Sequence, residues 1–150
     1  MSIRTTLFPE YQLGYNECTG DLSVADLARG YANFQAMPDA LHIQNTINDL
    51  RGLGSARMFP EGLEQFGRVL IEDMSKARTS RNIVLLAPPK AALGLVSEYA
   101  RQINASGHGR CAVHFDFERA LDWLGLPHSV MMLPTESGRR LIDIDPGWPR

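Results

Sequence analysis

The sequence has little cysteine, no long apolar run and no excess of charge of one sign. Its two cysteines, Cys18 and Cys111, stand in segments with strand character and in no CxxC or Cys/His cluster of metal-ligand spacing. We therefore expect buried reduced thiols rather than a disulfide or a metal site. Fifteen Lys and Arg against 17 Asp and Glu give a net charge of −2. Because the basic residues are scattered along the chain, nucleic acid is not an expected partner.

Long apolar segments and repeats are also missing. No stretch approaches the run of about 18 apolar residues that a membrane span needs, and residues 1–10 contain no apolar signal segment. We therefore expect a cytoplasmic protein without membrane insertion. The chain has no internal repeat and no low-complexity linker. Its 150 residues, of which 44% are hydrophobic and 21% charged, predict an ordinary globular domain with a sizeable core.

The first half of the chain predicts two strands, a helix, a third strand and a second helix. Strand-forming residues over 3–8 and 12–19 flank a turn and predict an antiparallel hairpin. Ser23 and Asp26 have the spacing of a capping box, so a helix is expected from residue 24 until Pro38. A rather polar third strand is expected over 43–50, and a second helix is expected from Pro60 to residue 77. Three basic residues suit the C-terminal end of that second helix: Lys76, Arg78 and Arg81.

The second half continues the alternation. The apolar run 83–87 predicts a strand covered on both faces and is the best candidate for the centre of the sheet. A helix that ends near Gly107 follows, then a strand over 111–115, then a helix over 117–124 with Asp116 as its N-cap. The order ββαβαβαβα predicts an α/β fold with a mixed, mostly parallel sheet of about five strands.

The pattern changes after Pro127. Apolar segments flank a turn at 134–138, so we expect a hairpin or an extended tail over 127–150, appended to a domain over 1–126. The apolar residues of this tail must dock, either on their own domain or on a partner chain. Trp148 favours the second alternative, a homodimer in which each tail covers the other subunit. The residues concerned are Val130, Met131, Met132, Leu133, Leu141, Ile142 and Ile144.

Two loops are candidates for binding an anion. One follows the third strand, where an open α/β sheet places its ligands, and the other precedes the third helix. Neither matches the G-x-G-x-x-G or P-loop pattern. A structural role is the favoured interpretation for both, with Asp49 at the strand end capping the first loop. The candidate ligand-binding residues are Arg51, Gly52, Gly54, Ser55 and Lys90.

The histidines of the C-terminal third lack the partners of a catalytic site. His108, His114 and His128 occur in no G-x-S-x-G, HExxH or Cys/His arrangement. Solvated loops for two of them, and the back of a strand for His114, are the favoured interpretation. We therefore predict no catalytic residue, no metal and no cofactor.

Taken together, the residues resemble a known family. The resemblance covers about 3–126 and rests on the order of elements and on the segments 47–52 (INDLRG), 83–88 (IVLLAP) and 117–124 (FERALDWL). The chain is similar to the STAS-like family of small α/β domains, especially its stand-alone bacterial, SpoIIAA-like members.

The resemblance implies a non-catalytic regulatory domain that binds a partner protein. In this family the switch is phosphorylation of a serine at the start of the helix that follows the third strand. The family's Asp-Ser-Ser is replaced in this sequence by Arg57-Met58-Phe59, and Ser55 lies too early. No phosphorylation site is therefore expected at the family position.

Three functions follow in order of preference. The first is a non-catalytic cytoplasmic regulatory or protein-interaction module, whose partner is another protein or a second copy of the chain. The second is a carrier of a small amphipathic ligand or lipid, held between helices and sheet with Arg51 or Lys90 at the mouth of the site. The third is an enzyme that uses one of the three histidines.

Overall fold

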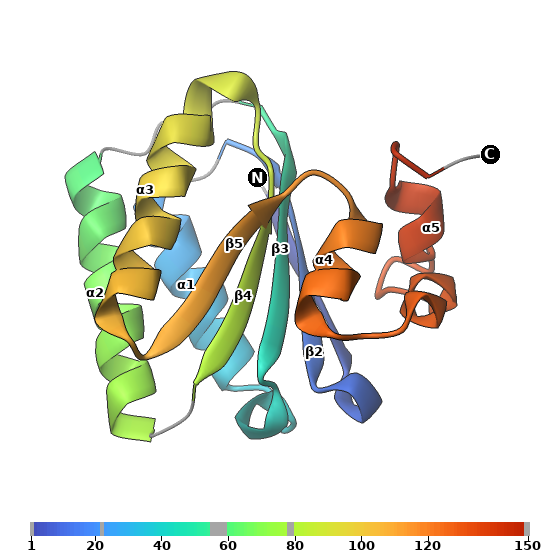
Figure 1. The fold of residues 1–150 in the computed structure, drawn as a ribbon, viewed down its shortest axis with the longest axis horizontal. Helices are drawn as coiled ribbons and strands as arrows, with labels where there is room; N and C mark the ends of the chain where they lie inside the picture. Colours follow the sequence, from blue (N-terminus) through green and yellow to red (C-terminus); the bar gives the residue numbers. More distant parts are fainter. Residues whose placement is uncertain (1, 22, 55–59, 78–79, 149–150) are drawn as a thin grey trace.

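The computed structural model describes residues 2–21, 23–54, 60–77 and 80–148 and contains a five-stranded sheet whose strands lie in chain order (Figure 1). The first two strands pair antiparallel, and all later neighbours pair parallel. This confirms the α/β class and the mixed, mostly parallel sheet predicted from the sequence. The strands are β1 (Ser2–Phe8), β2 (Leu13–Gly20), β3 (Asn45–Leu53), β4 (Arg81–Leu86) and β5 (Gly109–His114).

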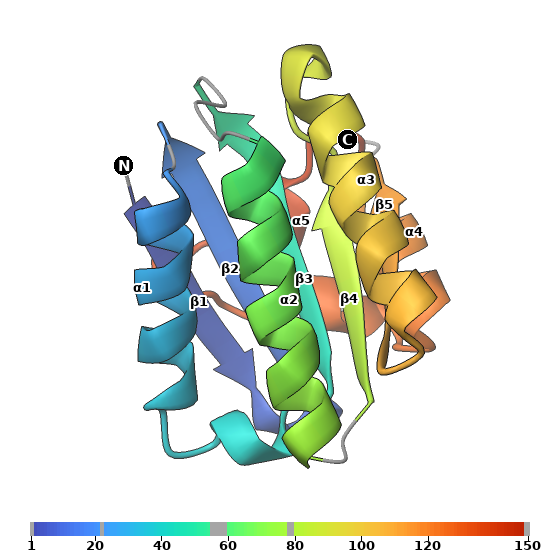
Figure 2. The ribbon, with the colours of Figure 1, turned by 90° about the vertical axis from the view of Figure 1, so that its left-hand side faces the viewer.

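The helices cover the two faces of this sheet unequally. Each connection between neighbouring parallel strands contains one helix. Because such connections are right-handed and these strands follow one another in chain order across the sheet, their helices lie on the same face. Accordingly α1, α2 and α3 lie side by side on the same face, whereas α4 and α5 lie on the other (Figures 1 and 2). None of the described helices is both long enough and apolar enough to cross a membrane. The helices are α1 (Val24–Gln35), α2 (Pro60–Ala77), α3 (Lys90–Ser106), α4 (Phe117–Leu124) and α5 (Leu141–Ile144).

The predicted helix caps are present. The Ser23 N–H donates to Asp26 Oδ2 (2.9 Å) and the Asp26 N–H donates to Ser23 Oγ (3.2 Å), which completes the capping box of α1. Asp116 Oδ1 accepts from the Arg119 N–H at the start of α4 (2.8 Å). Gly107 ends α3 in the left-handed region, with φ 74°.

The sheet separates two apolar cores, and β4 contributes to both by strict alternation. Ile83 and Leu85 pack under α1, α2 and α3, whereas Val84 and Leu86 face α4 and the C-terminal tail. All four side chains are nearly inaccessible, as expected for a strand covered on both faces.

The prediction that this apolar strand forms the centre of the sheet is wrong, because β3 lies there. The antiparallel hairpin adds two strands on the side of β2, which moves the middle of the sheet to the third strand. β3 tolerates polar residues because they pair across the strands: Asn82 Nδ2 donates to Asn45 Oδ1 at 3.1 Å. Arg81 was expected at the end of a helix but begins β4, and Arg78 lies outside the described residues.

The C-terminal tail is not a hairpin. It forms a short 3₁₀ helix (His128–Met132), a turn that contains Gly138 at φ 81°, and α5, with only an isolated bridge between Pro134 and Arg140 in the described tail. A strand would place Val130 and Met131 on opposite faces, but both are buried in the core formed with α4, which a helical turn allows.

Docking of the tail therefore occurs on the domain of its own chain, through Val130, Met131 and Leu141. The expected homodimer stays a prediction.

Candidate functional site

Arg51, the first residue of the predicted anion-binding loop, belongs to a buried ionic network on the face covered by α4. Its Nε and Nη2 donate to the two carboxylate oxygens of Asp49, each at 2.9 Å, and its Nη1 donates to Asp145 Oδ1 at 3.0 Å. The Tyr15 hydroxyl donates to Asp49 Oδ2 at 2.9 Å. The donors of Arg51 are thus directed at carboxylates of its own chain.

Asp145 connects this network to the tail. It also accepts from the N–H of Phe117 at 3.1 Å and from that of Gly147 at 3.0 Å, and the Arg51 guanidinium lies 4.9 Å from the centroid of the Phe117 ring. Burial lowers the pKa of Arg51, but the hydrogen bonds and charges of Asp49 and Asp145 outweigh it, so this pKa lies above its ordinary value. We interpret the network as a clamp that fixes the tail to β3.

The other predicted site residues do not join Arg51 in one pocket. Gly52 is the penultimate residue of β3, where an added Cβ would lie 3.1 Å from a Thr19 side-chain carbon. The Gly54 N–H donates to the Gly20 carbonyl at 3.1 Å. Lys90 begins α3, is exposed and forms no ion pair with the described residues. Ser55 lies outside the described residues.

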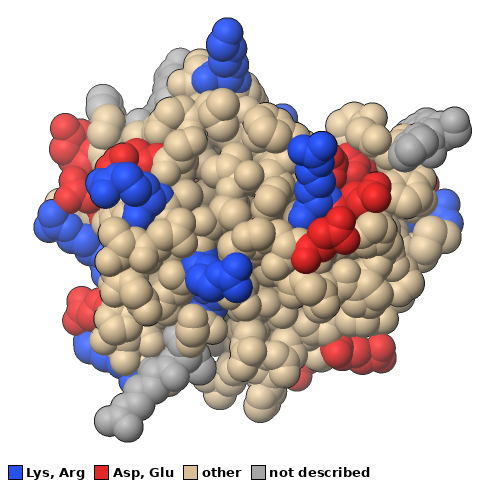
Figure 3. Space-filling model, in the orientation of Figure 1, with Lys and Arg blue, Asp and Glu red and all other residues tan. Residues whose placement is uncertain are grey.

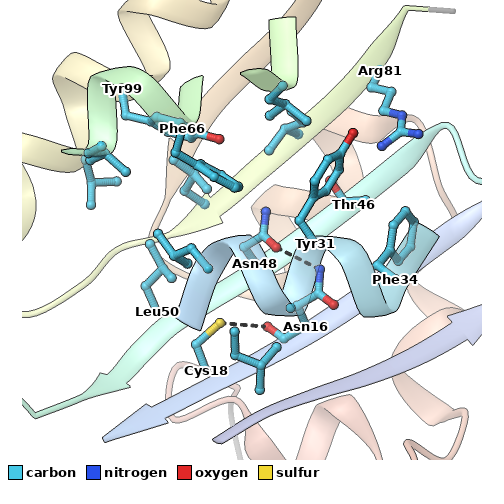
Figure 4. Close-up of a pocket in the computed structure, with 18 residues that line it drawn as sticks. Asn16, Cys18, Tyr31, Phe34, Thr46, Asn48, Leu50, Phe66, Arg81 and Tyr99 are labelled. Atoms are coloured by element: carbon cyan, nitrogen blue, oxygen red, sulfur yellow. Dashed lines mark hydrogen bonds between the residues drawn. The ribbon is translucent and has the colours of Figure 1, made fainter. Parts of the chain in front are cut away.

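A cavity of about 130 Å³ lies on the opposite face, between α1, α2, α3 and the sheet (Figure 4). Its floor comes from β2, β3 and β4. At one end α1 and α2 are joined by the hydrogen bond from the Tyr31 hydroxyl to Asp73 Oδ2, at 3.1 Å. The aliphatic part of the wall is formed mainly by Leu27, Leu50, Leu63, Leu70, Leu85 and Val96.

Aromatic rings line much of the remaining wall. Phe66 of α2 meets Tyr31 of α1 edge to face, with centroids 6.0 Å apart, and is stacked on Tyr99 of α3 at 6.2 Å. Phe34 lies at the C-terminal end of α1, and the guanidinium of Arg81 is 5.8 Å from the centroid of its ring. The cavity therefore presents ring surfaces contributed by three helices.

A polar ladder crosses the floor. Thr5 Oγ1 donates to Asn16 Oδ1 at 2.7 Å, and Asn16 Nδ2 donates to Asn48 Oδ1 at 2.8 Å. Asn48 Nδ2 donates to no side chain or backbone group in the described ranges and points into the cavity (Figure 4). Although Asn48 lies in the middle of the central strand, it is only half-buried, because the cavity lies above it.

Arg81 stands at one end of the cavity, at the first residue of β4. Its side chain has no carboxylate within 4.0 Å among residues 2–21, 23–54, 60–77 and 80–148. Asp73, which Tyr31 contacts, is the acid at this end. Burial raises the pKa of Tyr31 to about 12, although the charge of Arg81 acts in the opposite direction. Tyr31 is therefore a neutral hydroxyl at physiological pH.

Sequence reasoning missed this site. Arg81 was assigned to a helix end, Asn48 was one of the polar residues of the third strand, and Asn16 was not singled out. The signal that could have revealed the site combines two features: amide side chains at inward positions of neighbouring strands, and a following strand that begins with arginine.

The cysteines and histidines contribute no reactive cluster to the cavity. Cys18 and Cys111 are buried free thiols, and burial raises the pKa of each to about 12. Cys18 lines the cavity but none of the three histidines does. His114 Nε2 is buried and has no hydrogen-bond partner in the described part of the chain, and burial lowers the pKa of His114. His128 Nε2 lies 2.6 Å from Asp122 Oδ1. The described residues contain no group of three metal-ligating side chains.

On the face shown in Figure 3, the Lys and Arg side chains stand apart, several of them beside acidic residues.

No family model matches the chain, and no curated protein is significantly similar to it. The resemblance to the STAS-like family therefore stays a prediction, based on the element order and the short segments alone.

Proposed function

We propose that the chain is a non-catalytic small-ligand-binding module of STAS-like type, and that its ligand occupies the cavity between α1, α2 and the sheet. The observation that carries this proposal is the open donor of Asn48 on the floor of a mostly apolar cavity. Protein interiors are packed with few voids, and ligand pockets are mostly apolar with a few polar groups that orient the ligand. A ligand that fills the space and accepts from Asn48 explains both features together.

This proposal selects the second of the functions expected from the sequence and moves its site. The cation at the end of the cavity is Arg81, in place of Arg51 or Lys90. The regulatory, partner-binding role implied by the family resemblance stays a prediction. Binding of a ligand in the cavity is a signal that such a module could transmit to a partner protein. Because His108, His114 and His128 lie off the cavity wall, we propose binding rather than catalysis.

The test is an NMR titration of the full chain with benzyl alcohol, an uncharged single-ring probe. We expect millimolar probe to shift amide resonances of cavity-lining residues, and we expect Val96→Phe, which extends a ring into the cavity, to abolish these shifts. Val69→Phe is the matched control, because Val69 is 52% exposed on α2 and lies off the cavity wall. If neither benzyl alcohol nor benzoate shifts the lining residues of the unmodified protein, the proposal is wrong.

A further inference from the structure

We propose that the ligand of this cavity is a single-ring aromatic carboxylate, of the chemical class of benzoate. The ring lies against Tyr31, Phe34 and Phe66, and the carboxylate is bound by Arg81. This inference rests on the proposed function and specifies the substrate class of the same site.

The size of the cavity sets the size of the ligand. Its volume is about 130 Å³, and an apolar protein cavity of about 150 Å³ takes up one benzene molecule. One ring therefore fits within this volume, whereas a fused ring system or a long acyl chain exceeds it. The lipid that was one of the expected ligands is accordingly disfavoured by volume.

The charge of the cavity sets the charge of the ligand. Arg81 is a permanently charged guanidinium, half-buried, with no carboxylate of the described chain within 4.0 Å. Its planar fork of donors matches a carboxylate in a bidentate manner. Asn48 Nδ2 adds further N–H donors on the floor. A cationic ligand would meet like charge here, and a neutral ring would leave these donors unused.

One cation with a few neutral donors suits a singly charged group. A phosphate monoester carries close to two negative charges and three acceptor oxygens. The described wall supplies a single cationic side chain, Arg81, and most of the remaining wall is apolar. A monocarboxylate is therefore the better match for this end of the cavity.

The walls favour a ring over an aliphatic chain. Phe66 and Tyr31 meet edge to face, and Phe34 presents its ring beside the guanidinium of Arg81 (Figure 4). An aromatic ring inserted among them gains offset or edge-to-face contacts in addition to the burial of apolar surface. An aliphatic chain gains burial alone.

The experiment compares three probes on the full chain by NMR titration: benzoate, benzyl alcohol and pentanoate. We expect benzoate to bind about 10- to 100-fold more tightly than benzyl alcohol, as one charge-assisted pair allows. We expect Arg81→Gln to remove this preference by weakening benzoate binding, and the dispersion of its amide resonances shows whether the variant is folded. Arg110→Gln is the matched control, because Arg110 likewise lies over a ring, 4.6 Å from the centroid of Trp123, but not at the cavity.

The possible outcomes separate the two proposals. Equal affinities for benzoate and benzyl alcohol, or a preference that survives in Arg81→Gln, overturn the carboxylate assignment and leave the cavity as a ligand site. Pentanoate binding as tightly as benzoate overturns the aromatic assignment. Absence of binding by all three probes overturns the proposed function together with this inference.

Discussion

Replacement of Asp145 by alanine is the sharpest test of how the tail is held. The Asp145 side chain is 1% exposed and accepts three hydrogen bonds, from Arg51, Phe117 and Gly147. Removing one partner of a buried ion pair costs about 3–5 kcal/mol, because the remaining donors stay desolvated. This is a large part of the total stability of about 5–15 kcal/mol that a domain usually has. We therefore expect Asp145→Ala to lower the free energy of unfolding by about 3–5 kcal/mol.

Urea denaturation followed by circular dichroism measures this change. With a urea m-value of about 2 kcal/mol/M, the expected midpoint shift is roughly 1.5–2.5 M. Asp143→Ala is the matched control, since Asp143 lies on α5, which ends directly before Asp145, but pairs with Arg140 at the surface, where an ion pair contributes at most about 1 kcal/mol. If the two variants have midpoints within experimental error of each other, the clamp is not the element that holds the tail.

Three further predictions concern the tail and the buried titratable groups. Truncation after Pro127 uncovers the core under α4, so we expect binding of the dye ANS to rise, and unchanged dye binding would contradict docking of the tail on its own chain. Light scattering of the intact chain tests the predicted homodimer. Burial raises the pKa of Cys18 and Cys111 from 9.0 to about 12, so the stability that these neutral thiols contribute below pH 9.0 is lost as the pH rises towards 12. Urea titrations at about pH 8 and pH 10.5 should therefore show a smaller loss of stability in Cys111→Ala than in the unmodified protein. Burial lowers the pKa of His114 below 6.5, so the stability that the neutral imidazole contributes above that pH is lost as the pH falls. His114→Phe should therefore reduce the change in melting temperature between about pH 7.5 and pH 5, and an unchanged pH dependence would contradict the burial effect.

Local patterns predicted the regular part of the fold well, because these elements depend on short-range chemistry. The capping box at Ser23 and Asp26 and the glycine at position 107 act within one turn of a helix. The alternation of β4 between two cores follows from the geometry of a single strand. Such features need no knowledge of distant residues.

The parts that sequence reasoning missed depend on residues far apart in the chain. The pairing of Arg51 with Asp145 was missed because the two residues are distant in sequence. The tail adopts helical turns because the surface over α4 and the sheet accepts Val130 and Met131 together. The cavity is a property of how α1 and α2 span the sheet, and neither helix signals it alone.

The clamp between Arg51 and Asp145 has a consequence for protein synthesis. Translation at about 5–20 residues per second separates the completion of α4 from the completion of the tail by roughly one to five seconds. During that interval the nascent chain exposes the apolar face around Tyr15 and Phe117, and the Arg51–Asp49 pair lacks its second carboxylate. The bond from the Glu136 N–H to Thr6 Oγ1 likewise forms only after residue 136 has been made. This face is therefore completed later than the rest of the sheet, and the yield of native protein should depend on what shields the nascent sheet until residues 128–148 are available.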